Sequence, residues 1–503
     1  MKRTPRLALT VLVAAVMSAC TSMKSHDELS NKVQDARHSG GIPAALQQLD
    51  ASVSSDADRA ELLYNMERGE LLRLNKQLDE STKTFLKADA KVQEWEDTAK
   101  TNPSKLLGML GASLISERLK AYEGRDYEKV WLTTRLAMNR LGANDLENAR
   151  VDIKRTHERE AVIAEFRSKE TDAAENEAKS KGANVQGKDI NGYPVETLND
   201  PEVLKLKNGY QNALSHYLAG FVYEVTNEPG LAAPGYRKAI ELKPDSGVLE
   251  EGLRGLDART SFTQKRKQRM TDTLFVIEAG SAPARKSRSF TLPVWISGKL
   301  RTVSISYPVI EPSHEPLLNN LVVNGQSFKL ESVVDLNVMA RRELKEDMPG
   351  MIFRNVTRAI AKGVVQDQLE KKAGLLGAVI GSVASAVTEQ ADDRIWRTLP
   401  GRVYVARGYL PEGEHRLTVA GRDLGAVKVG GQYAMVPVRL YDDSVIQGPV
   451  SSFGTLAAAP VADTKPANEA VKPADKAGEK AADKPGKKSK KAKAAEAAKP
   501  VNG

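Results

Sequence analysis

The spacing of apolar residues divides the chain into a helical first half and a strand-rich second half. From residue 30 to 257 apolar side chains recur at helical intervals, and clusters of β-branched residues are few. Near Thr273 the period changes to two, and residues 301–307 alternate between polar and apolar. This order predicts a multidomain α+β protein, with a helical domain at 30–257 and a strand-rich domain with inserted helices at 273–450.

Further strands and helices are expected within the second half. The segments GRVYVARGYL, EHRLTVAG and GAVKVGGQYAMVPVRLYD predict four more strands, and Gly430-Gly431 predicts a two-residue hairpin turn between the last two. A helix is expected to begin at Pro349, because a first helical turn tolerates proline and apolar residues then recur every four positions. The glycine-rich segment 373–387 predicts a tightly packed core helix, or alternatively a helix that contacts a membrane neighbour.

The helical half repeats at tetratricopeptide spacing, in which small and bulky residues recur at fixed offsets over about 34 residues. Gly220 and Tyr236 occupy a small and a bulky position in the strongest repeat, and Gly69 and Phe85 occupy the same positions in another. Small residues there let two antiparallel helices approach closely. The pattern predicts a tetratricopeptide-like fold, with a generic helical bundle as the alternative, and a mobile insertion at about 168–202.

A stack of such repeats presents a concave face lined by the first helix of each repeat. The register places five side chains on this face: Glu70, Arg73, Met138, Phe221 and Glu224. A groove with mixed apolar and charged side chains suits a peptide or a helix of a partner. The helical half is therefore predicted to be a protein-binding scaffold.

The N-terminus has the pattern of a secretory signal that ends at the single cysteine of the chain. A basic start precedes an apolar stretch at 7–17 that is too short to cross a bilayer. The small residues before Cys20 resemble the bacterial lipobox, which implies removal of residues 1–19, a lipidated Cys20 and a tether at 20–29. Thr21 then implies transfer to the outer membrane, facing the periplasm. The alternative is an ordinary secreted protein with a free thiol.

Charge is concentrated at the two ends of the chain. The signal and the C-terminal tail account for nearly all of the formal net charge of +9, so the body is nearly neutral and offers no nucleic-acid surface. The tail, residues 457–503, has 11 lysines, 6 acidic residues and no aromatic residue, and it is predicted to be disordered. Such a chain is attracted to polyanions, among them the carboxylates of peptidoglycan. A solubilising spacer is the alternative.

The sequence offers no convincing catalytic or metal-binding motif. None of the 6 histidines has a partner at metal-ligand spacing, and neither a nucleophile elbow nor a phosphate-binding loop occurs. We therefore expect no enzyme, no cofactor and no metal. Trp396 and Arg397, which directly precede a strand, form a candidate contact motif in which the tryptophan is either an exposed anchor or a core aromatic.

Several motifs together resemble a family of proteobacterial outer-membrane lipoproteins with tetratricopeptide repeats. They are the lipobox, the repeat motif LGxxDLExAR, the glycine-rich helix and the motif DxRxWRTLP, and the resemblance spans about Ser30 to Asp443. In the last motif the matching residues are Asp393, Arg394, Trp396, Arg397, Thr398, Leu399 and Pro400. The resemblance implies work in the envelope, associated with small lipoproteins that activate penicillin-binding proteins, and assigns no catalytic residue.

The predicted function is that of an outer-membrane-anchored periplasmic lipoprotein that acts as a protein-binding scaffold connected to peptidoglycan synthesis. Its expected partners are the membrane, through Cys20, envelope proteins and peptidoglycan. The alternative is a structural lipoprotein that links the outer membrane to the cell wall through its basic tail.

Overall fold

The computed structural model describes residues 25–106, 120–180, 195–296, 299–313, 315–352, 354–355, 358 and 391–457. All of these residues belong to one compact unit, and residues 459–503 form a second unit. The predictions for Cys20, for the glycine-rich segment 373–387 and for the tail beyond Ala457 lie outside the described residues.

Helices make up the described first half of the chain, as predicted. They are α2 (His26–Asp50), α3 (Asp56–Arg59), α4 (Leu62–Leu74), α5 (Leu78–Thr101), α7 (Asp126–Gly142), α8 (Leu146–Ser180), η2 (Val195–Thr197), α9 (Pro201–Lys205), α10 (Ala213–Val225), α11 (Pro229–Leu242), α12 (Gly247–Arg254), α13 (Leu256–Thr260) and α14 (Phe262–Lys265). Consecutive helices pack in pairs, α4 on α5, α7 on α8 and α10 on α11.

Strands follow from Thr271 onward, also as predicted. They are β1 (Thr271–Ala279), β2 (Lys286–Ile296), β3 (Lys299–Val309), β4 (Asn320–Val323), β5 (Gln326–Lys329), β6 (Glu331–Asp335), β7 (Arg402–Leu410), β8 (Gly413–Val419), β9 (Arg422–Val429), β10 (Tyr433–Leu440), β11 (Val445–Gln447) and β12 (Ser451–Phe453). The large sheet has the order β11-β10-β1-β7-β6, with β12 also paired to β10, and the small sheet has the order β5-β4-β8-β9. Strands β2 and β3 form a separate hairpin.

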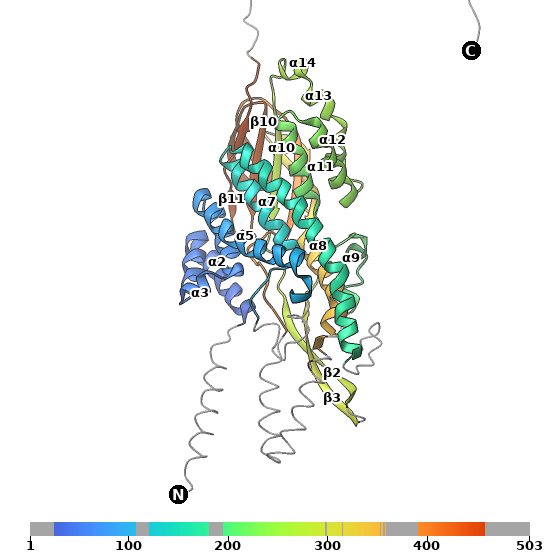
Figure 1. Cartoon of the computed structure of the whole chain (residues 1–503). Coiled ribbons are helices and arrows are strands. Elements are labelled where there is room, and N and C mark those ends of the chain that lie inside the picture. Colours follow the sequence, from blue (N-terminus) through green and yellow to red (C-terminus); the bar gives the residue numbers. More distant parts are fainter. Residues whose placement is uncertain are drawn as a thin grey trace, which may run out of the picture. The chain divides into compact units, whose positions relative to one another are not determined.

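The large sheet is the middle of three layers. Leu274 and Val276 of β1 belong to the core cluster that contains the helices. Phe275 and Ile277, which point to the opposite face because side chains alternate along a strand, pack with residues of the small sheet. Figure 1 shows the helices lying across the strands of the large sheet.

The helices and the large sheet share one hydrophobic core. Trp131 and Phe221 from the helices lie in the same cluster as Val276 and Val405 from the strands. The α+β class is therefore confirmed, but the two predicted domains, 30–257 and 273–450, form a single unit. The physical reason is that the helical layer buries its apolar face on the sheet.

The small and bulky residues of the repeat pattern meet in the structure. A Cβ atom added at Gly69 would lie 2.5 Å from the ring of Phe85, and one added at Gly220 would lie 2.6 Å from the ring of Tyr236. Both aromatic rings thus occupy the space that glycine leaves open on the preceding helix. These contacts show close packing within two helix pairs, while the tetratricopeptide fold itself stays a prediction.

Alanine at Gly235 is expected to destabilise the fold by about 1–3 kcal/mol, because overpacking forces the backbone apart. The added Cβ atom would lie 2.7 Å from the amide nitrogen of Gly220 and 2.8 Å from the carbonyl oxygen of His216. Gly230, on the same helix α11, is the matched control because its Cβ would meet nothing within 4 Å. Urea unfolding should show a lower midpoint for Gly235→Ala and an equal or higher one for Gly230→Ala; equal losses would contradict this packing.

Three local predictions were wrong. Gly430-Gly431 does not close a hairpin, because β9 pairs with β8 in the small sheet while β10 pairs with β1 in the large one. The expected insertion at 168–202 includes residues 168–180, which are the helical end of α8, and its residues 181–194 lie outside the described residues. Residues 336–352 are helical, so Pro349 lies well inside that helix and not in its first turn.

Candidate functional site

The concave face predicted for the repeats is covered by the chain's own large sheet. The five side chains assigned to that face do share one side of the helical layer. All are buried: Glu70, Arg73, Met138, Phe221 and Glu224. The expectation of an open groove is therefore corrected, because strands β1, β7 and β10 occupy the place of a partner.

Glu70 and Arg73 belong to an ionic cluster between helices and sheet, called here the Glu278 cluster. Its members are Glu70, Arg73, Arg135, Glu278 and Arg439. Arg73 Nη2 lies 2.8 Å from Glu278 Oε2 and 2.9 Å from Glu70 Oε1. Burial alone would raise the pKa of Glu278, but the three arginines outweigh burial and hold that pKa below its usual range. Met138 lies against the same cluster, with its sulfur 3.3 Å from Arg135 Nη1.

Glu224 belongs to a second buried cluster farther along the same face. Arg407 Nη2 lies 2.7 Å from Glu224 Oε1 and 2.7 Å from Asp272 Oδ2, and Arg259 Nε lies 2.6 Å from Glu224 Oε1. Burial would raise the pKa of Glu224, but Arg407 and Arg259 outweigh it and lower the pKa to about 2. Phe221 packs beside this cluster, edge-on to Tyr433.

The two residues of the candidate contact motif, Trp396 and Arg397, lie in different environments. Trp396 is fully buried and packs edge-on against Phe85, so it is a core aromatic and not an exposed anchor. Arg397 is half-buried and donates a hydrogen bond from its backbone N–H to Glu67 Oε1 at 2.6 Å. Glu67 Oε2 accepts the N–H of Thr398 at 3.0 Å, so a single carboxylate holds this turn.

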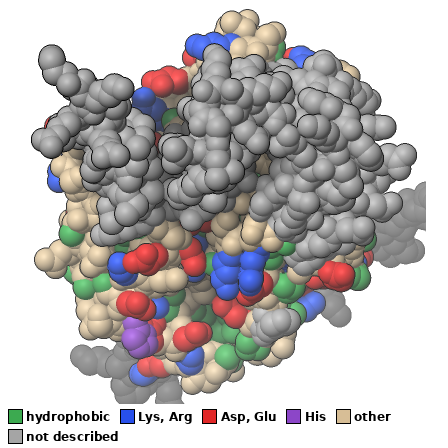
Figure 2. All heavy atoms as spheres, turned by 90° about the horizontal axis from the view of Figure 1, so that it is seen from below, with side chains coloured by type: hydrophobic (Ala, Val, Ile, Leu, Met, Phe, Trp, Pro, Cys, Tyr) green, Lys and Arg blue, Asp and Glu red, His purple; other side chains and the backbone are tan. Residues whose placement is uncertain are grey.

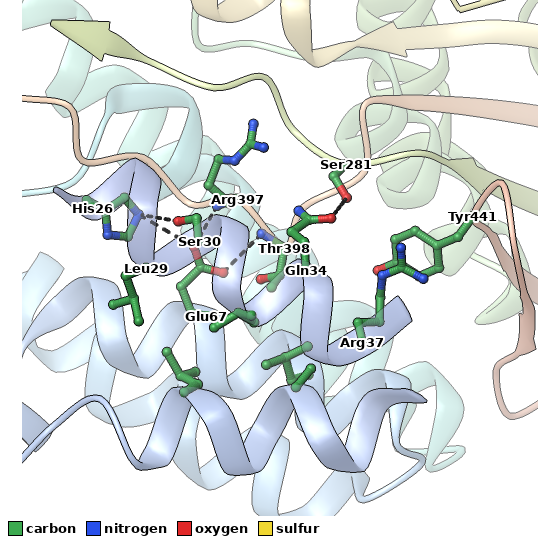
Figure 3. Close-up of a pocket in the computed structure, with 14 residues that line it drawn as sticks. His26, Leu29, Ser30, Gln34, Arg37, Glu67, Ser281, Arg397, Thr398 and Tyr441 are labelled. Atoms are coloured by element: carbon green, nitrogen blue, oxygen red, sulfur yellow. Dashed lines mark hydrogen bonds and ion pairs between the residues drawn. The ribbon is translucent and has the colours of Figure 1, made fainter. Parts of the chain in front are cut away.

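A small pocket lies between α2 and the turn at 397–398 (Figure 3). Its apolar wall includes Val33, Leu49 and Leu71. Its polar rim brings together the following side chains: His26, Ser30, Gln34, Arg37, Glu67, Ser281, Arg397, Thr398 and Tyr441. Such a lining can hold a small amphipathic group. Within it Ser30 Oγ lies 3.2 Å from His26 Nε2, and that same nitrogen lies 2.8 Å from the carbonyl oxygen of Ile395.

Burial favours the neutral forms of two ionisable side chains that line this pocket, Glu67 and His26. Burial raises the pKa of Glu67 to about 7, although hydrogen bonds from Thr398 and Arg397 oppose the change. Burial also lowers the pKa of His26, whose Nε2 lies 4.0 Å from Glu67 Oε1. Arg37 stacks on Tyr441 and pairs with Asp443 at 2.7 Å. Sequence reasoning missed Glu67, because its partners lie more than 300 positions away along the chain.

The start of α2 and the root of the tail lie at opposite ends of strand β1. Ser25 Oγ donates to Asp393 Oδ2 at 2.5 Å, in the loop that leads to Gly401, whose N–H bonds to Ala279 at the end of β1. At the other end the N–H of Ala457 bonds to Gln268, which lies just before the start of β1. Strand β1 has 9 residues and spans roughly 30 Å. In Figure 1, α14 lies at the top of the body and α2 lies much lower.

Viewed from below in Figure 2, the described acidic and basic side chains are interspersed. Over the described parts of the chain, no helix combines the length and hydropathy needed to cross a membrane. Within those same parts, no group of three or more His, Cys, Asp or Glu side chains is arranged to hold a metal ion.

The histidines that the structure describes have packing or hydrogen-bonding roles. His216 Nε2 lies 3.1 Å from Glu160 Oε2, and its ring stacks on that of His157. His415 contacts the carbonyl oxygen of Pro411.

Neither the known protein families, nor the curated proteins, nor the solved structures contain a match to this chain.

Proposed function

We propose that this chain is an outer-membrane lipoprotein of the periplasm that links the membrane to the cell wall. In this proposal Cys20 carries the lipid, the folded body acts as a non-catalytic spacer, and the lysine-rich tail binds the carboxylates of peptidoglycan. The observation that carries the proposal is the position of Ser25 and Ala457 at opposite ends of β1.

The lengths along the chain fit such a link. Cys20 precedes Ser25 by five residues, which span at most about 17 Å even when fully extended. A lipid on Cys20 therefore keeps the start of α2 close to the membrane surface. The root of the tail then lies farther out by roughly the length of β1, about 30 Å. The tail that follows contains 11 lysines.

A bridging experiment tests both ends at once. Fluorescent vesicles that carry the lipidated full chain are mixed with purified sacculi, and the vesicle fluorescence that sediments with the sacculi is measured. We expect the full chain to bring down vesicles at low salt and to release them as salt rises, because contacts between exposed charges are screened. Deletion of residues 458–503 should lower the sedimented fluorescence by about tenfold or more, because many weak contacts act together.

Two controls define the result. Replacing every tail lysine by glutamine keeps the length of the tail and should lower bridging as far as deletion does. Cys20→Ala protein should bind sacculi without bringing vesicles down. Bridging by the tail-deleted protein equal to that of the full chain would overturn the proposal.

The protein-binding scaffold is the second candidate, in a changed form. The concave face is covered by the sheet, so this candidate uses another surface, the pocket beneath α2. The observation in its favour is the combination of an apolar wall, at Val33 and Leu71, with the half-buried Arg397 on the rim. This candidate expects partner binding that is independent of the tail.

A further inference from the structure

A cationic and apolar surface lies at the end of the body where the tail begins. We call it the basic patch, and it consists of Phe262, Lys265, Arg266, Lys267, Arg269 and Met270. Between positions 258 and 271 the chain has no acidic residue. Phe262 is 73% exposed and Met270 is 42% exposed, which makes this an unusual place for large apolar side chains.

The basic patch is held firmly against the end of the large sheet. Gln268 Nε2 donates to the carbonyl oxygen of Gln432 at 2.6 Å, and Gln432 Nε2 donates to that of Lys265 at 3.0 Å. The ammonium of Lys265 lies 5.3 Å from the ring centroid of Tyr433. The patch is therefore a preformed surface, and a ligand would not have to order it.

The cations of the basic patch are not neutralised by the rest of the described chain. Arg266, Lys267 and Arg269 are exposed, and among the residues that the structure describes none of them forms an ion pair. The nearest acidic positions along the chain are Asp257 and Asp272, and Asp272 is already bound to Arg407. An anionic ligand thus meets several uncompensated charges on one fixed surface.

We propose that the basic patch is a second binding surface for the acidic polymer of the cell wall, adjacent to the root of the tail. This inference rests on the proposed linking function and extends it. The wall is favoured over a lipid surface because the patch lies at the end of β1 opposite to Ser25, so a chain anchored through Cys20 turns the patch away from its membrane.

The patch and the tail reinforce each other. The N–H of Ala457, where the tail begins, bonds to the carbonyl oxygen of Gln268 within the patch segment. Once the tail has bound the polymer, the patch meets it at a high effective concentration, and the reverse also holds. Exposed apolar side chains beside the cations, at Phe262 and Met270, add contact area of the kind that marks interaction surfaces.

The test measures sacculus binding of the full chain with Arg266→Gln, Lys267→Gln and Arg269→Gln combined. Loss of three exposed charge contacts should weaken binding by about tenfold at low salt. The matched control carries Lys87→Gln, Lys100→Gln and Lys105→Gln, which remove the same charge from exposed positions on and after α5. The control should bind within about twofold of the unmodified chain.

Equal binding by the two triple variants would overturn the basic patch while leaving the tail's role intact. The same substitutions in a chain that lacks residues 458–503 separate the two ideas further. If the tail-deleted chain still binds sacculi and the patch substitutions abolish that binding, the patch is supported. If deletion of the tail alone abolishes all binding, the patch is overturned. A patch variant that binds sacculi normally but loses binding to vesicles of anionic phospholipid also overturns it, since the surface would then recognise lipid.

Discussion

Replacing Glu278 by glutamine is expected to destabilise the fold by about 3–5 kcal/mol, the usual cost of leaving buried charges without their partner. Glu278 is fully buried and contacts Arg73, Arg135 and Arg439. Without its charge the three arginines share only Glu70. The measurement is the free energy of unfolding in urea at neutral pH.

Two further variants make this prediction sharp. Glu80→Gln removes a carboxylate whose ion pair with Lys83 is exposed, and it should leave the urea midpoint almost unchanged. Adding Arg135→Met to Glu278→Gln removes one uncompensated cation and should recover part of the loss, which would give a favourable coupling between the two positions. Equal midpoints for Glu278→Gln and Glu80→Gln would show that the cluster does not hold the helices on the sheet.

Close packing between neighbouring helices could be predicted from the sequence because it is local. Gly220 and Tyr236 are 16 positions apart and lie on consecutive helices, so their spacing alone reports the contact. The helical spacing also predicted that Glu70 and Phe221 lie on the same side of the helical layer. Both side chains are buried on that side, against the sheet. What covers that face was not readable from the helices themselves.

The covering sheet depends on contacts between distant parts of the chain. Arg73 and Glu278 are 205 positions apart, and no local pattern relates them. A signal was nevertheless present, since Glu278 is the one charge in the run 274–279 and Arg439 is the one charge in β10. A charge in a buried strand needs a partner, and charged side chains of α4 and α7 provide it. Similarly, Gly430-Gly431 does lie between two strands, but the predicted hairpin was wrong because these strands belong to different sheets.

The stability of the body is also expected to fall as pH rises from about 4.5 to 7, and Glu67→Gln should remove part of that fall. Burial raises the pKa of Glu67 to about 7 in the folded chain, from an ordinary value of 4.5. Below pH 4.5 the carboxyl is protonated in both the folded and the unfolded chain. Between 4.5 and 7 only the unfolded chain releases the proton, so the folded state loses about 1.4 kcal/mol per pH unit, or about 3 kcal/mol in all.

The quantity to measure is the difference in unfolding free energy between the unmodified chain and Glu67→Gln at several pH values. Glu343, whose pKa burial raises to about 8, and Asp152, whose pKa burial raises to about 6, titrate in both proteins, so their contributions cancel in the difference. The difference should fall by about 3 kcal/mol between pH 4.5 and 7 and then level off. A difference that stays constant would show that the N–H groups of Arg397 and Thr398 stabilise the carboxylate enough to offset its burial. The expected result would make the contact between Glu67 of α4 and the turn at 397–398 weaker at neutral pH than in acid. This contact lies at the end of the body that a lipid on Cys20 would hold to the membrane.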